Sequence, residues 1–161
     1  MNLHVREADL ANPLDSSGVV AVLDSYAADP IGGGQPLSSA VRSRLVPALR
    51  AHPTTFAVLA FADAEPVGVA ICFFGLSTFQ ARPLLNIHDL AVLPQYRGKG
   101  VGRALLRAVE EHAKRKGCCK LTLEVRDDNT RALGLYRSFG FGDFIVGEPT
   151  PTRFLGKLLE P

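Results

Sequence analysis

The chain has 161 residues, of which 47% are hydrophobic and 21% are charged, and its formal net charge is +2. This length suits one domain over residues 1–161, and the composition excludes disordered and fibrous proteins. The charge is too small for the clustered basic face by which proteins bind nucleic acids, so we expect no nucleic-acid partner.

The first residues, the apolar runs and the cysteines indicate the cellular compartment. Arg6 and Glu7 place charges where a secretory signal needs an apolar core, and no apolar run approaches the length of a membrane span. Cys72, Cys118 and Cys119 lack the number and spacing of a disulfide framework or a metal site. We therefore expect a cytoplasmic protein that has no membrane contact and binds no metal.

Hydrophobic periodicity predicts the secondary structure. Residues 29–36 hold two prolines and three consecutive glycines, so they must form a loop. Asp15, Ser16 and Ser17 supply N-cap oxygens for the helix before this loop. In chain order we expect a strand at 3–6, helices at 14–28 and 37–51, strands at 54–62, 66–78 and 84–93, a helix at 101–116, a strand at 120–126, a helix at 129–137, and strands at 144–146 and 153–159.

This order of elements predicts an α/β fold with one mixed sheet flanked by helices. The turn-rich residues 62–66 join two of the strands as a hairpin. The last strand, at 153–159, offers an edge for pairing with a second copy, so we expect that a homodimer forms through it if the protein is oligomeric.

The most informative segment, residues 90–106, reads Leu-Ala-Val-Leu-Pro-Gln-Tyr-Arg-Gly-Lys-Gly-Val-Gly-Arg-Ala-Leu-Leu. Its glycines let backbone N–H groups converge, and the helix that begins there adds its positive end, so the segment suits a diphosphate. A Walker loop fails because Gly100 follows Lys99 where Ser or Thr is needed. A Rossmann-type fingerprint fails because Arg103 occupies the third glycine position, although Glu124 near a later strand end keeps that alternative open.

Two segments resemble the GNAT superfamily of acyl-CoA N-acyltransferases. Arg97-x-x-Gly100-x-Gly102, with residues 89–94 before it, is similar to the CoA pyrophosphate loop and fourth strand of that family. Residues 121–141 are similar to its following strand, its Asn-started helix and its Leu-Tyr-x-x-x-Gly-Phe ending. The resemblance is strong over residues 84–141 and weak before residue 54. It implies a single-domain, mostly antiparallel twisted sheet with strands four and five splayed, and acetyl-CoA as cosubstrate.

Acyl transfer from a thioester needs a neutral amine, stabilisation of an oxyanion and a proton for the departing thiolate. The resemblance implies that Tyr136 protonates the sulfur, although a helix tyrosine also packs in many cores. It implies that Asn129 contacts the CoA arm, although capping its helix explains that residue equally well. The implied cofactor-binding residues are Leu90, Ala91, Val92, Arg97, Gly98, Lys99, Gly100, Val101, Gly102, Arg103, Asn129 and Tyr136, with the backbone N–H groups of Leu90 and Val92 facing the acetyl carbonyl and the pantetheine arm.

The general base has three candidates. Glu124 precedes Tyr136 by twelve positions, a spacing that resembles the ribosomal-protein alanine acetyltransferases of the family. His88 and Asp89 lie where the polyamine acetyltransferases carry adjacent acidic residues, and histidine is the more usual base. Each of the three also fits a purely structural role. We favour Glu124.

The resemblance implies that the acceptor is a primary amine of a small molecule or a peptide, and the sequence does not choose between these. Residues 73–79 and the loop at 26–35 are placed to wall its site, and Asp24, Asp29 and Asp89 are placed to attract a cationic amine. A CoA-binding sensor without turnover is the alternative from another class of function. The presence of Tyr136 and of candidate bases argues against it.

Overall fold

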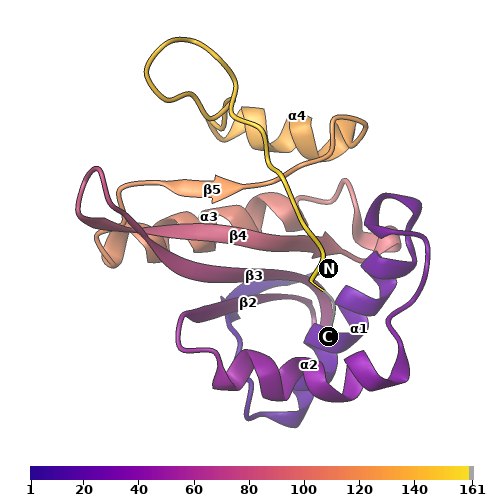
Figure 1. The fold of residues 1–161 in the computed structure, drawn as a ribbon. Coiled ribbons are helices and arrows are strands. Elements are labelled where there is room, and N and C mark those ends of the chain that lie inside the picture. Colours follow the sequence, from indigo (N-terminus) through magenta and orange to yellow (C-terminus); the bar gives the residue numbers. More distant parts are fainter. Residues whose placement is uncertain (160–161) are drawn as a thin grey trace. The chain divides into compact units, whose positions relative to one another are not determined.

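The structure is a computed structural model that describes residues 1–159. It contains two compact units, of which the first covers residues 1–123 and the second begins at Glu124 (Figure 1). A single domain over residues 1–161 stays a prediction. No helix in residues 1–159 is long and apolar enough to cross a membrane.

One five-stranded sheet lies in the first unit, and its spatial order follows the sequence. Neighbouring strands are antiparallel except β4 and β5, which are parallel. The predicted α/β class with a mostly antiparallel sheet is therefore confirmed. The strands are β1 (Leu3–Glu7), β2 (Thr55–Ala62), β3 (Glu65–Ser77), β4 (Arg82–Val92) and β5 (Leu121–Leu123).

Four α-helices and two short 3₁₀ turns complete the described chain. The N-cap of the first helix is Asn12, whose side chain accepts hydrogen bonds from Leu14 and Asp15 N–H. The prediction of a cap at Asp15, Ser16 or Ser17 was wrong because these residues already lie in the first turns of the helix. The bounds are α1 (Pro13–Ala28), η1 (Pro30–Gly32), α2 (Ser39–Ala51), η2 (Pro94–Tyr96), α3 (Val101–Arg115) and α4 (Thr130–Ser138).

Helices α1 and α2 cover one face of the sheet, and α3 covers the other. On the first face Val19 and Leu49 pack with Leu59 and Ile71 in one buried cluster. This face is called the α1–α2 face below.

Helix α3 buries the apolar stripe that its sequence predicts, including Leu105 and Val109. The His112 ring stacks on Phe56 of β2 at a centroid distance of 3.6 Å. Gly68 of β3 permits close packing here, because a Cβ at this position would lie 2.8 Å from Cγ1 of Val101. The first turn of α3 is thus held firmly against the sheet.

The C-terminal part differs from the prediction. Residues 144–146 and 153–159 form no strands, and the pairing there is one isolated bridge between Ile145 and Pro151. Pro149 and Pro151 lack the N–H groups that a ladder needs, which opposes a regular hairpin. Strand β5 is also shorter than the predicted 120–126. Dimerisation through residues 153–159 stays untested and lacks its predicted strand.

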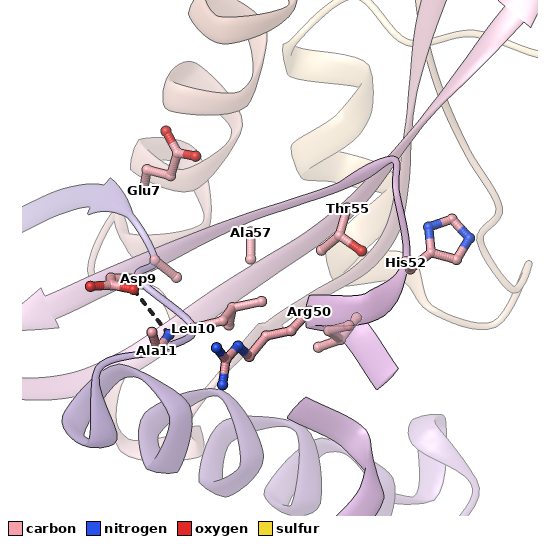
Figure 2. Close-up of a pocket in the computed structure, with 10 residues that line it drawn as sticks. Glu7, Asp9, Leu10, Ala11, Arg50, His52, Thr55 and Ala57 are labelled. Carbon is pink, nitrogen blue, oxygen red and sulfur yellow. Dashed lines mark hydrogen bonds between the residues drawn. The ribbon is translucent and has the colours of Figure 1, made fainter. Parts of the chain in front are cut away.

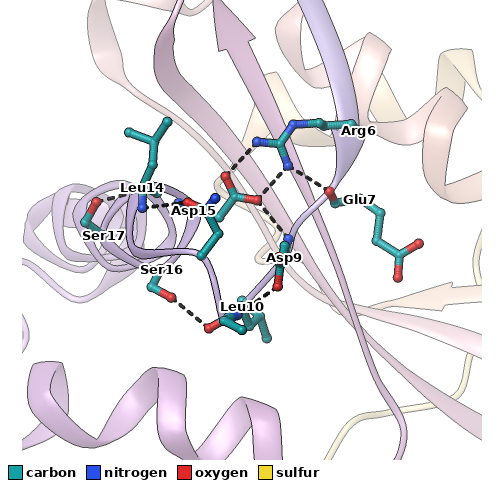
Figure 3. A network of polar contacts seen from close by, with 10 residues as sticks. Arg6, Glu7, Asp9, Leu10, Leu14, Asp15, Ser16 and Ser17 are labelled. Atoms are coloured by element: carbon teal, nitrogen blue, oxygen red, sulfur yellow. Dashed lines mark hydrogen bonds and ion pairs between the residues drawn. The ribbon is translucent and has the colours of Figure 1, made fainter.

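A polar network joins β1 to the start of α1 (Figure 3). The two guanidinium nitrogens Nη1 and Nη2 of Arg6 donate to the Asp15 carboxylate at 2.6 and 2.7 Å, and Asp9 N–H donates to it at 2.8 Å. The Asp15 side chain is fully buried, whereas that of Arg6 is 44% exposed. Hydrogen bonds from Arg6, the largest influence, hold the pKa of Asp15 below its usual value.

We expect Asp15→Asn to lower the free energy of unfolding by about 2–3 kcal/mol at pH 7, because charge-assisted hydrogen bonds are lost. Since the folded-state pKa is depressed, this stabilisation is present above the unfolded value of about 3.9 and is lost as pH falls through the folded value. Urea unfolding of the wild type and of Asp15→Asn should therefore give a difference in free energy of unfolding that narrows below about pH 4. Glu111→Gln on the exposed face of α3 is the control. An equal difference in free energy of unfolding at pH 7 and at low pH would contradict the stabilising role of the ionised Asp15 carboxylate.

Candidate active site

A β-bulge shapes the middle of β4. Asp89 pairs with Ile71 of β3, but the next residue of β3, Cys72, pairs with Ile87, so His88 is an extra residue on β4. Asp89 shares the α1–α2 face with its partner Ile71, and the His88 ring contacts Phe73 on that same face. The bulge thus turns two consecutive side chains, His88 and Asp89, toward one side of the sheet. In the sequence, two adjacent polar residues interrupting strand alternation were the signal for it.

Beyond the bulge, one edge of β4 is open. Strand β5 pairs with β4 only up to Leu123, and no strand in the described chain pairs with residues 88–92 on that edge. Leu93 N–H donates to Val67 of β3 at 2.9 Å. Because N–H directions alternate along a strand, those of Val92 and Leu90 point away from β3, toward the open edge. Between them, Ala91 is buried in the cluster on the α1–α2 face.

The glycine loop follows directly. Gly98 and Gly100 have φ values of 73° and 85°, a left-handed conformation that favours glycine, and the space next to each Cα is open to beyond 4 Å. Gly100 is the N-cap of α3, so the N–H groups of Val101 and Gly102 lie in the first helical turn, where helix geometry gives them no partner within the helix. The loop therefore places backbone donors beside open space on the protein surface.

The cations of this loop are held by other parts of the first unit. The Lys99 ammonium lies 5.4 Å from the ring centroid of Tyr96, whose hydroxyl donates to Glu65 at 2.7 Å. Arg97 Nε donates to the carbonyl oxygen of Val92 at 3.1 Å, and its Nη1 donates to Asp29 at 2.9 Å. Sequence reasoning missed the contact with Asp29, because 68 residues separate the two partners.

The bulge pair has distinctive electrostatics. Burial raises the pKa of the Asp89 carboxyl, and the neighbouring His88 opposes this in part. Burial, together with the Asp89 charge, also raises the pKa of the Cys72 thiol to about 12, so Cys72 stays a neutral packing residue. The Phe73 ring contacts His88 at 5.5 Å and His52 at 4.8 Å, both edge-on.

A hollow of about 520 Å³, which His52 helps to line, lies on the α1–α2 face (Figure 2). Its lining includes the polar side chains of Asp9, Arg50 and His52. The buried hydroxyl of Thr55 in this wall has no hydrogen-bond partner in the described chain. Asp9 uses one oxygen to cap the turn at Ala11 N–H.

The second unit carries the remaining predicted site residues. Glu124 directly follows β5 and is exposed. Asn129 is the N-cap of α4, where its side-chain oxygen accepts from Ala132 N–H at 3.2 Å. Tyr136 is 8% exposed, and its ring meets Phe141 edge-on at 5.8 Å. The capping role of Asn129 is therefore confirmed, and its contact with CoA stays a prediction.

Two of the three carboxylates expected to attract a cationic amine already have positive partners. Asp24 accepts from Leu37 N–H at 2.8 Å and lies 3.5 Å from Arg42, and Asp29 pairs with Arg97. For the third carboxylate, Asp89, His88 is the charged group that lowers its pKa, against the effect of burial. In residues 1–159 no three side chains of His, Cys, Asp or Glu gather in a way that would hold a metal ion.

Known proteins are similar to this sequence over part of its length. The sequence profile of the acetyltransferase (GNAT) family matches residues 20–141. Thialysine N-epsilon-acetyltransferase of Bos taurus is 39% identical over 82 residues, 51% of this chain and 48% of that protein. N-alpha-acetyltransferase RimI of Mycobacterium tuberculosis is 40% identical over 83 residues, 50% of this chain and 51% of that protein. The chain thus spans about half the length of these curated relatives.

Solved structures share the fold. An aminoglycoside acetyltransferase, meta-AAC0020, from an uncultured soil metagenomic sample has a TM-score of 0.76 at 18% identity, covering 97% of this chain and 96% of that one. Ribosomal-protein-alanine N-acetyltransferase from Brucella melitensis biovar Abortus 2308 has a TM-score of 0.76 at 17% identity, covering 98% and 100%. With the family profile matched over more than half of its length, this chain belongs to the acetyltransferase (GNAT) family.

Proposed function

We propose that this chain moves the acetyl group of acetyl-CoA to a primary amine of a small molecule or a peptide by direct attack. One observation supports this most: the open edge of β4 runs straight into the glycine loop at the start of α3. A thioester with a long arm and a diphosphate needs both features in succession. Sequence relatives that are N-acetyltransferases support the reaction class.

The diphosphate is bound by the loop from Arg97 to Arg103. Its left-handed glycines leave room for the phosphate oxygens, and the first-turn N–H groups of α3 donate to them. The pantetheine arm then lies along the open edge of β4, where the N–H groups of Leu90 and Val92 are directed. One of these donors faces the acetyl oxygen and stabilises the negative charge that develops there.

The reaction transfers one acetyl group and two protons. The amine nitrogen attacks the thioester carbonyl carbon, and the C–S bond breaks as the oxyanion collapses. Tyr136 gives its phenolic proton to the departing sulfur, and a base accepts the proton that the nitrogen loses. Among the base candidates we propose Glu124, acting through a water molecule, with His88 and Asp89 as alternatives presented together by the bulge.

Changes in the pH profile should separate these bases. We expect the rate to rise with pH as the ammonium of the acceptor loses its proton, and Glu124→Gln to lower kcat by about 10²–10⁴-fold. His88→Gln should leave the profile unchanged. The part of the pH profile to watch is the rise in rate that occurs as the base itself loses its proton. If Glu124→Gln keeps the wild-type profile and His88→Gln removes this rise, His88 is the base. If Asp89 is the base, the rise should lie above the ordinary carboxyl range, because burial raises the pKa of Asp89.

Calorimetric titration with acetyl-CoA and with NAD tests the cofactor assignment. We expect acetyl-CoA to bind and NAD to give no heat of binding. Binding of NAD without affinity for acetyl-CoA would instead favour a Rossmann-type nucleotide-binding function for the loop.

A further inference from the structure

The Arg97 guanidinium joins two segments that are distant in sequence. Its Nε donates to Val92 at the end of β4, and its Nη1 donates to Asp29 between α1 and η1. The side chains of Arg97 and Asp29 are only 25% and 20% exposed, so water screens their interaction less than that of a surface pair. Arg97, the residue immediately before Gly98, therefore already forms an ion pair with a carboxylate of the protein itself.

Asp29 is held in place by its own turn. Its second carboxylate oxygen accepts from Ile31 N–H at 3.0 Å, and its backbone carbonyl accepts from Gly32 and Gly34 N–H at 2.8 and 3.0 Å. The turn is tight, since a Cβ at Gly32 would lie 1.9 Å from the backbone oxygen of Tyr26. The carboxylate thus stays where the guanidinium meets it, and it is not a mobile surface charge.

A diphosphate bound at the loop would attract the same guanidinium. Arginine binds phosphate and carboxylate oxygens through the same planar set of donors, so the two anions compete for it. A second cation of the loop, Lys99, lies over the ring of Tyr96 and is exposed.

We propose that Asp29 is a positioning residue that competes with the diphosphate of CoA for Arg97. The inference rests on the proposed function, because it takes the loop as the CoA site. Binding of CoA draws Arg97 from Asp29 and leaves the carboxylate, which its own turn holds in place, without its arginine partner. The ion pair between Arg97 and Asp29 therefore weakens CoA binding.

The test is calorimetric titration of CoA into single and double variants. Asp29→Asn keeps the oxygen that caps Ile31 but removes the charge, and we expect it to tighten CoA binding about three- to tenfold. Arg97→Ala should weaken binding. In the Arg97→Ala background the gain from Asp29→Asn should vanish, because the competition needs both partners.

Two controls separate competition from general electrostatics. Asp24→Asn removes the same charge from α1, yet Asp24 pairs with Arg42, so it should change CoA affinity less than twofold. Pantetheine, which lacks the diphosphate, should bind Asp29→Asn and wild type alike. An unchanged or weaker affinity of Asp29→Asn for CoA, an equal gain in Asp24→Asn, or a gain that persists without Arg97 would overturn the inference. A wild-type protein that binds no CoA would instead refute the proposed function.

Discussion

Replacing Gly100 by valine is expected to abolish measurable binding of CoA and acetyl-CoA. Gly100 has a φ of 85° and open space beside its Cα, where a diphosphate is expected to approach the backbone. A branched side chain fills that space and disfavours the left-handed conformation by about 1–2 kcal/mol. Calorimetric titration measures the loss directly, and Gly102→Val in the first turn of α3 should have the same effect.

Gly117 provides the matched control for this substitution. It follows the other end of α3, and it likewise has a positive φ, 72°, and open space at its Cβ position. Gly117→Val thus carries a similar backbone strain and should lower the Tm to a similar extent, but we expect its CoA affinity to change less than twofold. Wild-type affinity in Gly100→Val would remove the loop from the cofactor site.

Replacing Tyr136 by phenylalanine should lower kcat by about 10²–10⁴-fold, the contribution of a positioned general acid. Affinity for acetyl-CoA should hardly change, because only the proton for the leaving sulfur is lost. Tyr136 is almost fully buried and packs against Phe141, and phenylalanine keeps that ring contact. The fold should therefore survive the substitution.

Single-turnover kinetics decide this prediction. They isolate the chemical step from product release, which otherwise hides a slower proton transfer. An unchanged single-turnover rate in Tyr136→Phe would show that the sulfur takes its proton from another donor. Lower activity that comes only with weaker acetyl-CoA binding would point to a role in packing.

Local patterns predicted most of the fold. The apolar stripe of α3 and the long apolar runs of β2 and β3 are strong signals, and the structure forms these elements nearly where they were expected. The strands predicted at 144–146 and 153–159 do not form. The prediction gave their apolar residues more weight than Pro149 and Pro151, which lie between them. Proline removes a backbone donor whatever its neighbours are.

The candidate site was predictable only where its geometry is local. The glycine loop and the cap at Asn129 follow from short segments of sequence. The pairing of Arg97 with Asp29 depends on how α1 ends beside β4, which no local pattern records. For the same reason the sequence could not show that Asp24 and Asp29 are already neutralised by arginines.

The central claim is transfer of an acetyl group to an amine. It is tested most directly by incubating the protein with acetyl-CoA and a panel of amines: polyamines, amino-acid derivatives, aminoglycosides and peptides with a free N-terminus. Released thiol and the acetylated product are measured together. We predict that at least one amine is acetylated with one equivalent of CoA released, and that Tyr136→Phe slows this reaction. Tight binding of acetyl-CoA without acetylation of any amine in such a panel would contradict the claim and favour a CoA-sensing protein.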